Sequence, residues 1–171
     1  AASTLAAIAV KHADYQKAIV DKGGVVPLVN LLKTGSAAVQ AEAAHAIATL
    51  DAEVSHQEGI IKAGAVLPLV AVLKNGSAAA QASAAQATAN AAKFSHASQK
   101  AIARAGSVPL LLTLLGVGKA QKPAAQALAM LACNNFDIQK EISEAGGIAP
   151  LLSLLNGLDV DVQVQAAAAL R

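Results

Sequence analysis

The sequence predicts an all-α solenoid, a stack of similar helical units that each take up about forty residues of chain. One observation is an internal repeat: DKGGVVPLVNLLKTGS, from Asp21, returns in related form from Lys62, Arg104 and Glu144. A fixed period of this length is the signature of repeat architectures. The other is composition, because 55% of the 171 residues are hydrophobic and only 2% are aromatic, with alanine the commonest residue. That composition favours helices over strands.

The first element of each unit is a short helix, such as the one expected from His56 to Lys62. A glutamine marks the same point of each period, with steps of 41, 42 and 40 residues: Gln16, Gln57, Gln99 and Gln139. A glycine follows the last residues of this helix in every unit: Gly23, Gly64, Gly106 and Gly146. Glycine accepts the left-handed conformation that ends a helix at little steric cost.

A second helix starts at a proline that follows this glycine, at Pro27, Pro68 or Pro150. Proline has no N–H and a fixed φ, and both properties suit the first helical turn. Pro109 lies one place closer to its glycine, so we expect a shifted start in the third unit. The second helix, for example PLVAVL, is apolar nearly all round, which predicts a core helix buried between others.

A third helix follows a glycine-containing turn, and its N-cap acceptors would be Ser36, Ser77 and Asp159. It is long and rich in alanine, as in AAAQASAAQATANAAK. A buried methyl contributes only about 0.8 kcal/mol, so such a helix needs the third helix of the next unit against it. Because Pro123 disfavours a helix interior, we expect this helix to start near Lys122 in the third unit.

The composition also limits the class of protein. No apolar run approaches the roughly 18 to 20 residues that span a membrane. The net charge is only +2, with charges scattered singly, so neither a nucleic-acid patch nor a polyanionic tail is predicted. Cys133 is the only cysteine, and we interpret it as a packed thiol. The absence of export signals and disulfides favours a cytoplasmic protein, with a nuclear one as the alternative.

The pattern resembles the armadillo repeat family, with three helices in about forty residues, a glycine–proline junction, a Leu-rich second helix and an Ala-rich third helix. Phrases such as QKAIARAGSVPLLLTLL are similar to armadillo arrays of plants and protists and of fungal vacuolar proteins. HEAT repeats fit the junction less well. The resemblance covers essentially the whole chain, and it implies a right-handed superhelix of three-helix repeats.

Aligned with that family, the chain divides into the end of one repeat, three repeats and an incomplete repeat: 1–11, 12–52, 53–93, 94–133 and 134–171. Solenoids normally end in polar caps, and neither terminus has one. We therefore expect a segment of a longer chain or larger complex. Its ends would expose Leu5, Ile8 and Leu170, which predicts poor solubility.

No catalytic, metal or cofactor site is predicted. No two of the four histidines lie three or four residues apart, and one cysteine cannot support a zinc cluster: His12, His45, His56 and His96. The stretch TLLGVGKA lacks the first glycine and the hydroxyl of a phosphate-binding loop, so we interpret it as a turn. We expect neither an enzyme nor a small-molecule substrate.

The resemblance implies a different kind of site. In armadillo proteins an extended peptide can lie along the third helices, held by an Asn ladder with Trp beside it. The ladder positions here are Ala7, Thr49, Asn90 and Met130, and the Trp positions are Ser3, His45, Gln86, Gln126 and Ala168. Only Asn90 matches, so recognition of a nuclear-import-type peptide is disfavoured, because the amide and stacking groups for it are missing.

We predict partner contacts along a set of third-helix residues that we call the ridge: His45, Thr49, Gln86, Asn90, Gln126 and Met130. The alternative is that these residues are solvated on a helix face. Lys93, Lys100 and Arg104 form a basic cluster that we interpret as a solvated edge, and the scarcity of aromatic residues argues against nucleic-acid binding.

The sequence thus predicts a non-enzymatic scaffold that binds a protein or an extended peptide segment. Two alternatives stay open. One is an architectural subunit that uses its outer or end surfaces. The other is the substrate-recognition array of a larger enzyme such as a ubiquitin ligase.

Overall fold

A computed structural model of the chain describes residues 13–50, 59–93 and 95–171, and these residues form helices with no strand. The predicted all-α class is therefore confirmed for the described chain. The helices follow one another as α2 (Ala13–Asp21), α3 (Val25–Thr34), α4 (Ala37–Leu50), α6 (Val66–Asn75), α7 (Ala78–Ala92), α8 (His96–Arg104), α9 (Ser107–Leu114), α10 (Gly118–Ala132), α11 (Phe136–Glu144), α12 (Ile148–Leu155) and α13 (Val160–Ala169).

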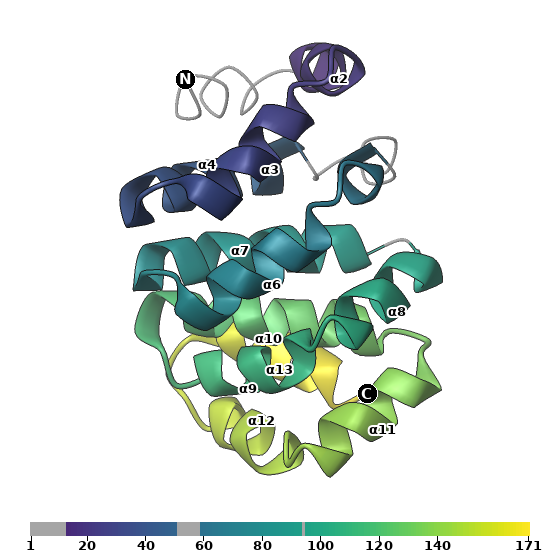
Figure 1. Cartoon of the computed structure of the whole chain (residues 1–171). Helices are drawn as coiled ribbons and strands as arrows, with labels where there is room; N and C mark the ends of the chain where they lie inside the picture. The colour runs from purple at the N-terminus through teal and green to yellow at the C-terminus, as the bar shows by residue number, and fades with distance from the viewer. Residues whose placement is uncertain (1–12, 51–58, 94) are drawn as a thin grey trace.

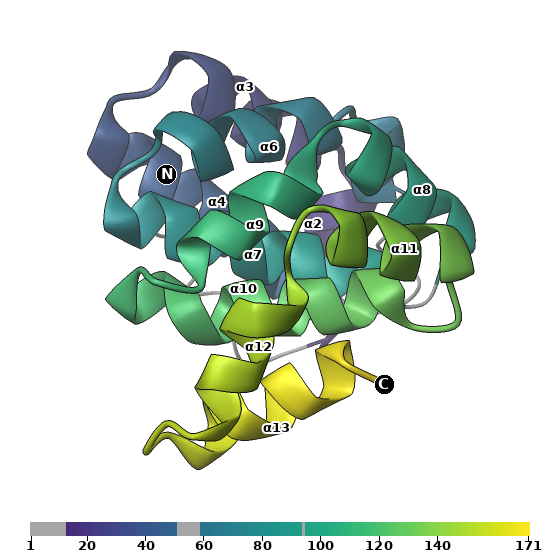
Figure 2. The same cartoon turned by 90° about the horizontal axis from the view of Figure 1, so that it is seen from below.

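The helices stack as a solenoid, in which the same element of each unit lies beside its counterpart (Figure 1). The third helices pack in chain order, α4 against α7, α7 against α10 and α10 against α13. The second helices α3, α6 and α9 form a second layer in front of them in this view. Seen from below, α12 and α13 continue both layers at the C-terminal end (Figure 2).

The glycine–proline junction forms, but each second helix begins two residues before its proline rather than at it. Gly106 has a φ of 83°, and its counterparts Gly23, Gly64 and Gly146 also lie in the left-handed region. The proline is the third residue of each second helix, where its missing N–H costs no helical hydrogen bond. Helix α9 begins one residue after its glycine, whereas the other second helices begin two residues after theirs. The shifted start expected from Pro109 is thus confirmed.

The second helices are only partly buried, and in this respect the sequence-based prediction is wrong. Each helix buries one face, as with Leu28, Val29 and Leu32 in α3. The opposite face meets solvent although it is also apolar in places, since Val26 is 51% and Leu67 is 70% exposed. Hydropathy predicts the burial of such residues on average, but a two-layer stack covers only one side of this helix.

The third helices form the core, as their alanine content predicts. Ala84, Ala85 and Ala87 of α7 are all fully buried between α4 and α10. Small side chains allow the axes of these helices to approach closely. The helices are therefore held together by many contacts between small groups rather than by a few large side chains. Ser77 caps α7 by accepting from the N–H of Ala80, and Asp159 caps α13 in the same way, as predicted.

Helix α10 differs from the prediction, because it begins at Gly118 and contains Pro123 in its interior. The expected start near Lys122 is wrong. Pro123 has no N–H for the carbonyl of Lys119, which lies in the first turn of α10. The stacking of α10 on both α7 and α13 offsets the local cost.

A glutamine side chain closes the turn between the second and third helices of every unit, a feature that the sequence analysis missed. Gln81 Nε2 donates to the carbonyl of Leu73, at the end of α6, over 3.0 Å. The same bond recurs from Gln40 to Leu32, from Gln121 to Leu115 and from Gln163 to Leu155. Each bond satisfies a carbonyl that has no partner within its own helix. The signal was present as a glutamine in the fourth position of each third helix.

Several predictions concern residues that the structure does not describe: Ser3, Leu5, Ala7, Ile8, His12, His56 and Gln57. Leu170 was expected to be exposed, but it is half-buried and packs against the core. The exposed apolar side chains of that region are instead Leu158, Val160 and Val164. Within the described residues, no helix is long and apolar enough to cross a membrane.

Candidate partner-binding site

The structure places the six residues of the ridge on three neighbouring third helices. Helix α4 carries His45 and Thr49, helix α7 carries Gln86 and Asn90, and helix α10 carries Gln126 and Met130. Within each helix the two residues are four apart and lie on the same face. His45 is exposed and the other five are half-buried. Because α4, α7 and α10 pack side by side, the ridge crosses three units in succession.

The centre of the ridge is a chain of hydrogen bonds between side-chain amides. Gln86 Nε2 donates to Asn90 Oδ1 over 3.0 Å, and Asn90 Nδ2 donates to the main-chain carbonyl of Ala48 over 2.7 Å. Asn90 therefore links α7 to the C-terminal end of α4. A partner that displaced this amide would break both bonds. The residue that best matches the family ladder is thus also a structural link between two units.

Within the described residues, no hydrogen bond joins another ridge side chain to a neighbouring unit. Thr49 Oγ1 donates to the carbonyl of His45, one turn back in α4. Met130 packs partly against the core, and its carbonyl accepts from Gln99 Nε2 over 2.9 Å. Ala168, at the corresponding place in α13, is half-buried. In the described structure the side chains of His45 and Gln126 have no hydrogen bond, and Gln86 keeps its Oε1 and a second N–H for a partner beside its bond to Asn90.

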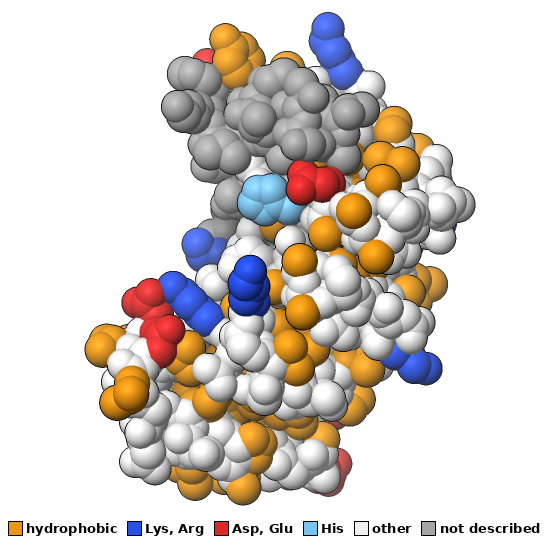
Figure 3. Space-filling model, turned by 90° about the vertical axis from the view of Figure 1, so that its left-hand side faces the viewer, with side chains coloured by type: hydrophobic (Ala, Val, Ile, Leu, Met, Phe, Trp, Pro, Cys, Tyr) orange, Lys and Arg blue, Asp and Glu red, His pale blue; other side chains and the backbone are white. Residues whose placement is uncertain are grey.

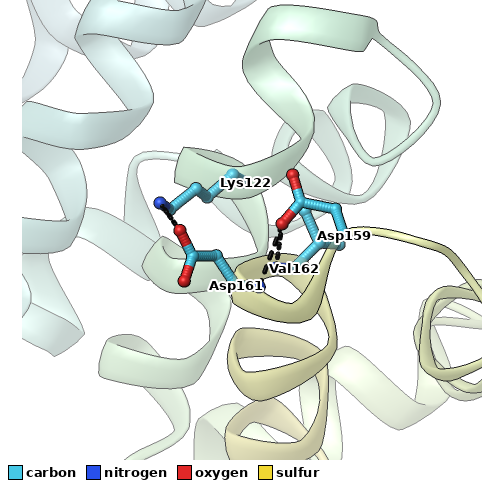
Figure 4. A network of polar contacts seen from close by, with 4 residues as sticks. All are labelled: Lys122, Asp159, Asp161 and Val162. Carbon is cyan, nitrogen blue, oxygen red and sulfur yellow. Dashed lines mark hydrogen bonds and ion pairs between the residues drawn. The ribbon is translucent and has the colours of Figure 1, made fainter.

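Charged groups are sparse around these helices. Figure 3 shows separated basic and acidic side chains among hydrophobic and neutral atoms, with one group in which both signs meet. Beside the ridge, Lys122 of α10 pairs with Asp161 of α13, and Asp159 Oδ1 accepts from the N–H groups of Asp161 and Val162 (Figure 4). The hydrogen bond to Asp161 raises the pKa of Lys122 above its usual value.

The predicted basic cluster lies opposite acidic side chains. Lys100 Nζ of α8 is 3.5 Å from Asp137 Oδ2 of α11. These two residues, with Arg104 and Glu141, line an open cleft of about 250 Å³ between the two helices. Burial raises the pKa of the Glu141 carboxyl. A cleft that carries both signs is not the uniformly positive surface that phosphate groups require.

The described residues include His, Cys, Asp and Glu side chains, which are the usual ligands of metal ions. No three His, Cys, Asp or Glu side chains there come close enough together to hold a metal ion. Cys133 is half-buried and follows directly after the end of α10.

Three-helix units that stack into one continuous core define an α-solenoid of the helical-repeat class. A family model for armadillo/β-catenin-like repeats matches residues 12–50 and 135–171. Solved armadillo repeat proteins also match nearly the whole chain at 30% identity. The chain belongs to the armadillo repeat family.

Two engineered or designed proteins illustrate the likeness. An engineered protein is 40% identical, with a TM-score of 0.93 over 99% of this chain and 70% of its own. A designed armadillo repeat protein in complex with the peptide (KR)4 is 30% identical, with a TM-score of 0.90 over 98% of this chain and 72% of its own.

A natural protein shares the fold at lower identity. The armadillo-repeats-only protein of Plasmodium falciparum is 21% identical, with a TM-score of 0.84 over 99% of this chain and 77% of its own. No match is found among curated proteins.

Proposed function

We propose that this chain is a non-enzymatic scaffold that binds an extended segment of a partner protein along the ridge. The observation that carries the proposal is the presence of hydrogen-bonding, uncharged side chains at one position of three stacked helices: His45, Gln86 and Gln126. The proposal is supported by a designed armadillo repeat protein of similar structure, which is described in complex with a peptide.

The spacing of these residues suits an extended chain. Packed helices lie about 8 to 10 Å apart, and an extended peptide rises about 3.3 Å per residue. Successive ridge residues would therefore meet roughly every third residue of a bound segment. Side-chain amides can pair with both the N–H and the C=O of a peptide unit.

The chemistry of the ridge favours an uncharged segment. A basic peptide such as (KR)4 needs carboxylates or aromatic faces for its cations. None of the six ridge residues is acidic or aromatic apart from the imidazole of His45. Affinity would come from many weak contacts on a rigid surface rather than from one reactive group.

The test is a selection of extended peptides from a random library against this chain, followed by affinity measurements with fluorescent peptides. Gln86→Ala combined with Gln126→Ala should weaken binding of the selected peptides at least tenfold, and (KR)4 should bind no better than a scrambled neutral peptide. The control pair is Asn30→Ala with Ser153→Ala, on exposed positions of the second helices. Peptides that bind the ridge variant as tightly as the unaltered chain would refute the proposal.

A further inference from the structure

The second helices carry a row of exposed apolar residues at one position of each unit. We call Val26, Leu67, Pro109 and Ala149 the second-helix row. Val26 is 51% and Leu67 is 70% exposed, and the other two residues are also exposed. Their separations of 41, 42 and 40 residues follow the period of the repeat. A single exposed apolar residue is normal on a protein surface, but a row of them aligned across four units forms a surface that can bind a partner.

The geometry of the stack sets the spacing of this row. Helix α3 packs against α6 and α6 packs against α9, in succession down the front of the molecule in Figure 1. Packed helices lie about 8 to 10 Å apart, so equivalent residues on them are separated by about the same distance. In an α-helix, residues seven positions apart are separated by about 10.5 Å along the axis. A helix laid across the stack would therefore meet one residue of the row with every heptad.

Positive charges border the row on both sides. Lys33 and Lys74 are exposed at the ends of α3 and α6, seven residues beyond Val26 and Leu67. On the N-terminal side of the row, an exposed cation lies one or two residues before the junction glycine in each of the first three units: Lys22, Lys62 and Arg104. The acidic residues near this border are Asp21 and Glu144, and Arg104 also shares a cleft with Asp137 and Glu141. Cations thus predominate around Val26 and Leu67, and they favour a partner with acidic flanks.

We propose that the second-helix row docks an amphipathic α-helix of a partner protein, with an apolar residue at every seventh position and acidic residues on both sides. Each apolar side chain covers one unit, with the greatest burial at Leu67. The flanking carboxylates lie near Lys33 and Lys74 on one side and near Lys22 on the other. This surface is separate from the ridge, because the second and third helices form different layers of the stack.

The test uses a synthetic helix of about four heptads, roughly 42 Å long, with Leu at every seventh position and Glu beside it. A peptide of the same composition with the leucines moved off the heptad is the control ligand. We expect the first peptide to bind the full chain, with affinity that falls as salt is raised. Leu67→Glu and Val26→Glu should each weaken binding at least tenfold, and Lys33→Glu with Lys74→Glu should do so in a salt-dependent way.

Val160→Glu is the matched protein variant, because Val160 is 67% exposed but lies on α13, away from the row. It should leave binding unchanged, and circular dichroism should show all variants folded. The ridge variant Gln86→Ala with Gln126→Ala should also bind the helix normally, which separates this proposal from the peptide-binding one. Equal binding of both peptides, no loss in Leu67→Glu, or binding of anionic vesicles in place of the helix would overturn it.

Discussion

The side-chain amide of Asn90 donates a 2.7 Å hydrogen bond to the main-chain carbonyl of Ala48, which lies 42 residues earlier in the sequence. Ala48 lies near the C-terminal end of the described part of α4. One side chain therefore joins α7 directly to the third helix of the preceding unit.

Asn90→Met should destabilise the fold by about 1 to 2 kcal/mol, because the Ala48 carbonyl loses a hydrogen-bond donor in a partly buried place. Methionine is the residue at the corresponding position of α10, so the change keeps a side chain that a third helix tolerates there. Denaturant unfolding followed by circular dichroism measures the effect. An unchanged midpoint would show that the bond contributes nothing to the stacking.

Gln81→Met should cost about 1 kcal/mol, since methionine keeps the length of the side chain but cannot donate to the Leu73 carbonyl. The control is Gln165→Met. Gln165 is a half-buried residue of α13, and its side chain has no hydrogen bond in the described structure. The two variants are compared by their unfolding midpoints in urea. Equal losses at both sites would mean that the change reflects glutamine replacement in general rather than the turn.

Ser107→Ala should stabilise the protein by about 1 kcal/mol, because its fully buried hydroxyl has no hydrogen-bond partner in the described structure. The corresponding residue of the second unit is Ala65, which is also fully buried. The same chemical change at Ser77 should have the opposite sign and cost about 1 kcal/mol, because it removes the N-cap of α7. Thermal unfolding of the two variants tests both signs, and a lower midpoint for Ser107→Ala would contradict the assignment.

Ala85→Leu should destabilise the fold by about 1 to 3 kcal/mol or more, because Ala85 is fully buried between stacked third helices and the added carbons have no space. Ala167 occupies the corresponding position of α13 but is exposed. Ala167→Leu should therefore change stability by less than about 0.5 kcal/mol. Calorimetry on both variants checks the contrast, which fails if Ala167→Leu is as damaging as Ala85→Leu.

The contribution of Lys122 to stability should depend on pH in the alkaline range. Its hydrogen bond to Asp161 raises the pKa of Lys122 in the folded state above 10.5. A raised lysine pKa means that the folded state holds the proton more tightly than the unfolded state, so the stabilisation is complete below pH 10.5 and is lost as the pH rises through the folded-state pKa. Lys122→Met should be less stable than the unaltered chain at neutral pH.

That difference between Lys122→Met and the unaltered chain should disappear well above pH 10.5. Urea midpoints across the alkaline range measure it. Lys119→Met, in an exposed lysine of the same helix, is the control for the loss of a lysine side chain from α10. A difference that persists at the highest pH would mean that Lys122 acts through packing of its stem rather than through charge.

The local pattern of each unit could be predicted from the sequence, because it depends on residues close in the chain. The left-handed Gly106, the proline in the first turn of each second helix and the N-caps Ser77 and Asp159 all form as expected. Pro123 could not be placed in the same way. Its helix extends to Gly118 because of contacts with α7 and α13, which no local rule contains.

In the candidate site, too, some features follow from the local sequence and others depend on contacts between helices. The helices and faces that carry Gln86, Asn90 and Gln126 follow from the repeat. The sequence does not predict the hydrogen bond from the amide of Asn90 to the carbonyl of Ala48, because that bond joins two units. The exposure of Val26 and Leu67 was also unpredictable from hydropathy, which led to the expectation of burial on all sides.

The sequence by itself determined the period, the three helices of a unit and the alanine lining of the third helix, since backbone preferences and hydrophobic spacing act within a few residues. Only the tertiary structure decided which apolar faces are covered and which side chains are paired across units. The physical reason is that burial and hydrogen bonding between units depend on the distance between neighbouring helices, and stacking sets that distance.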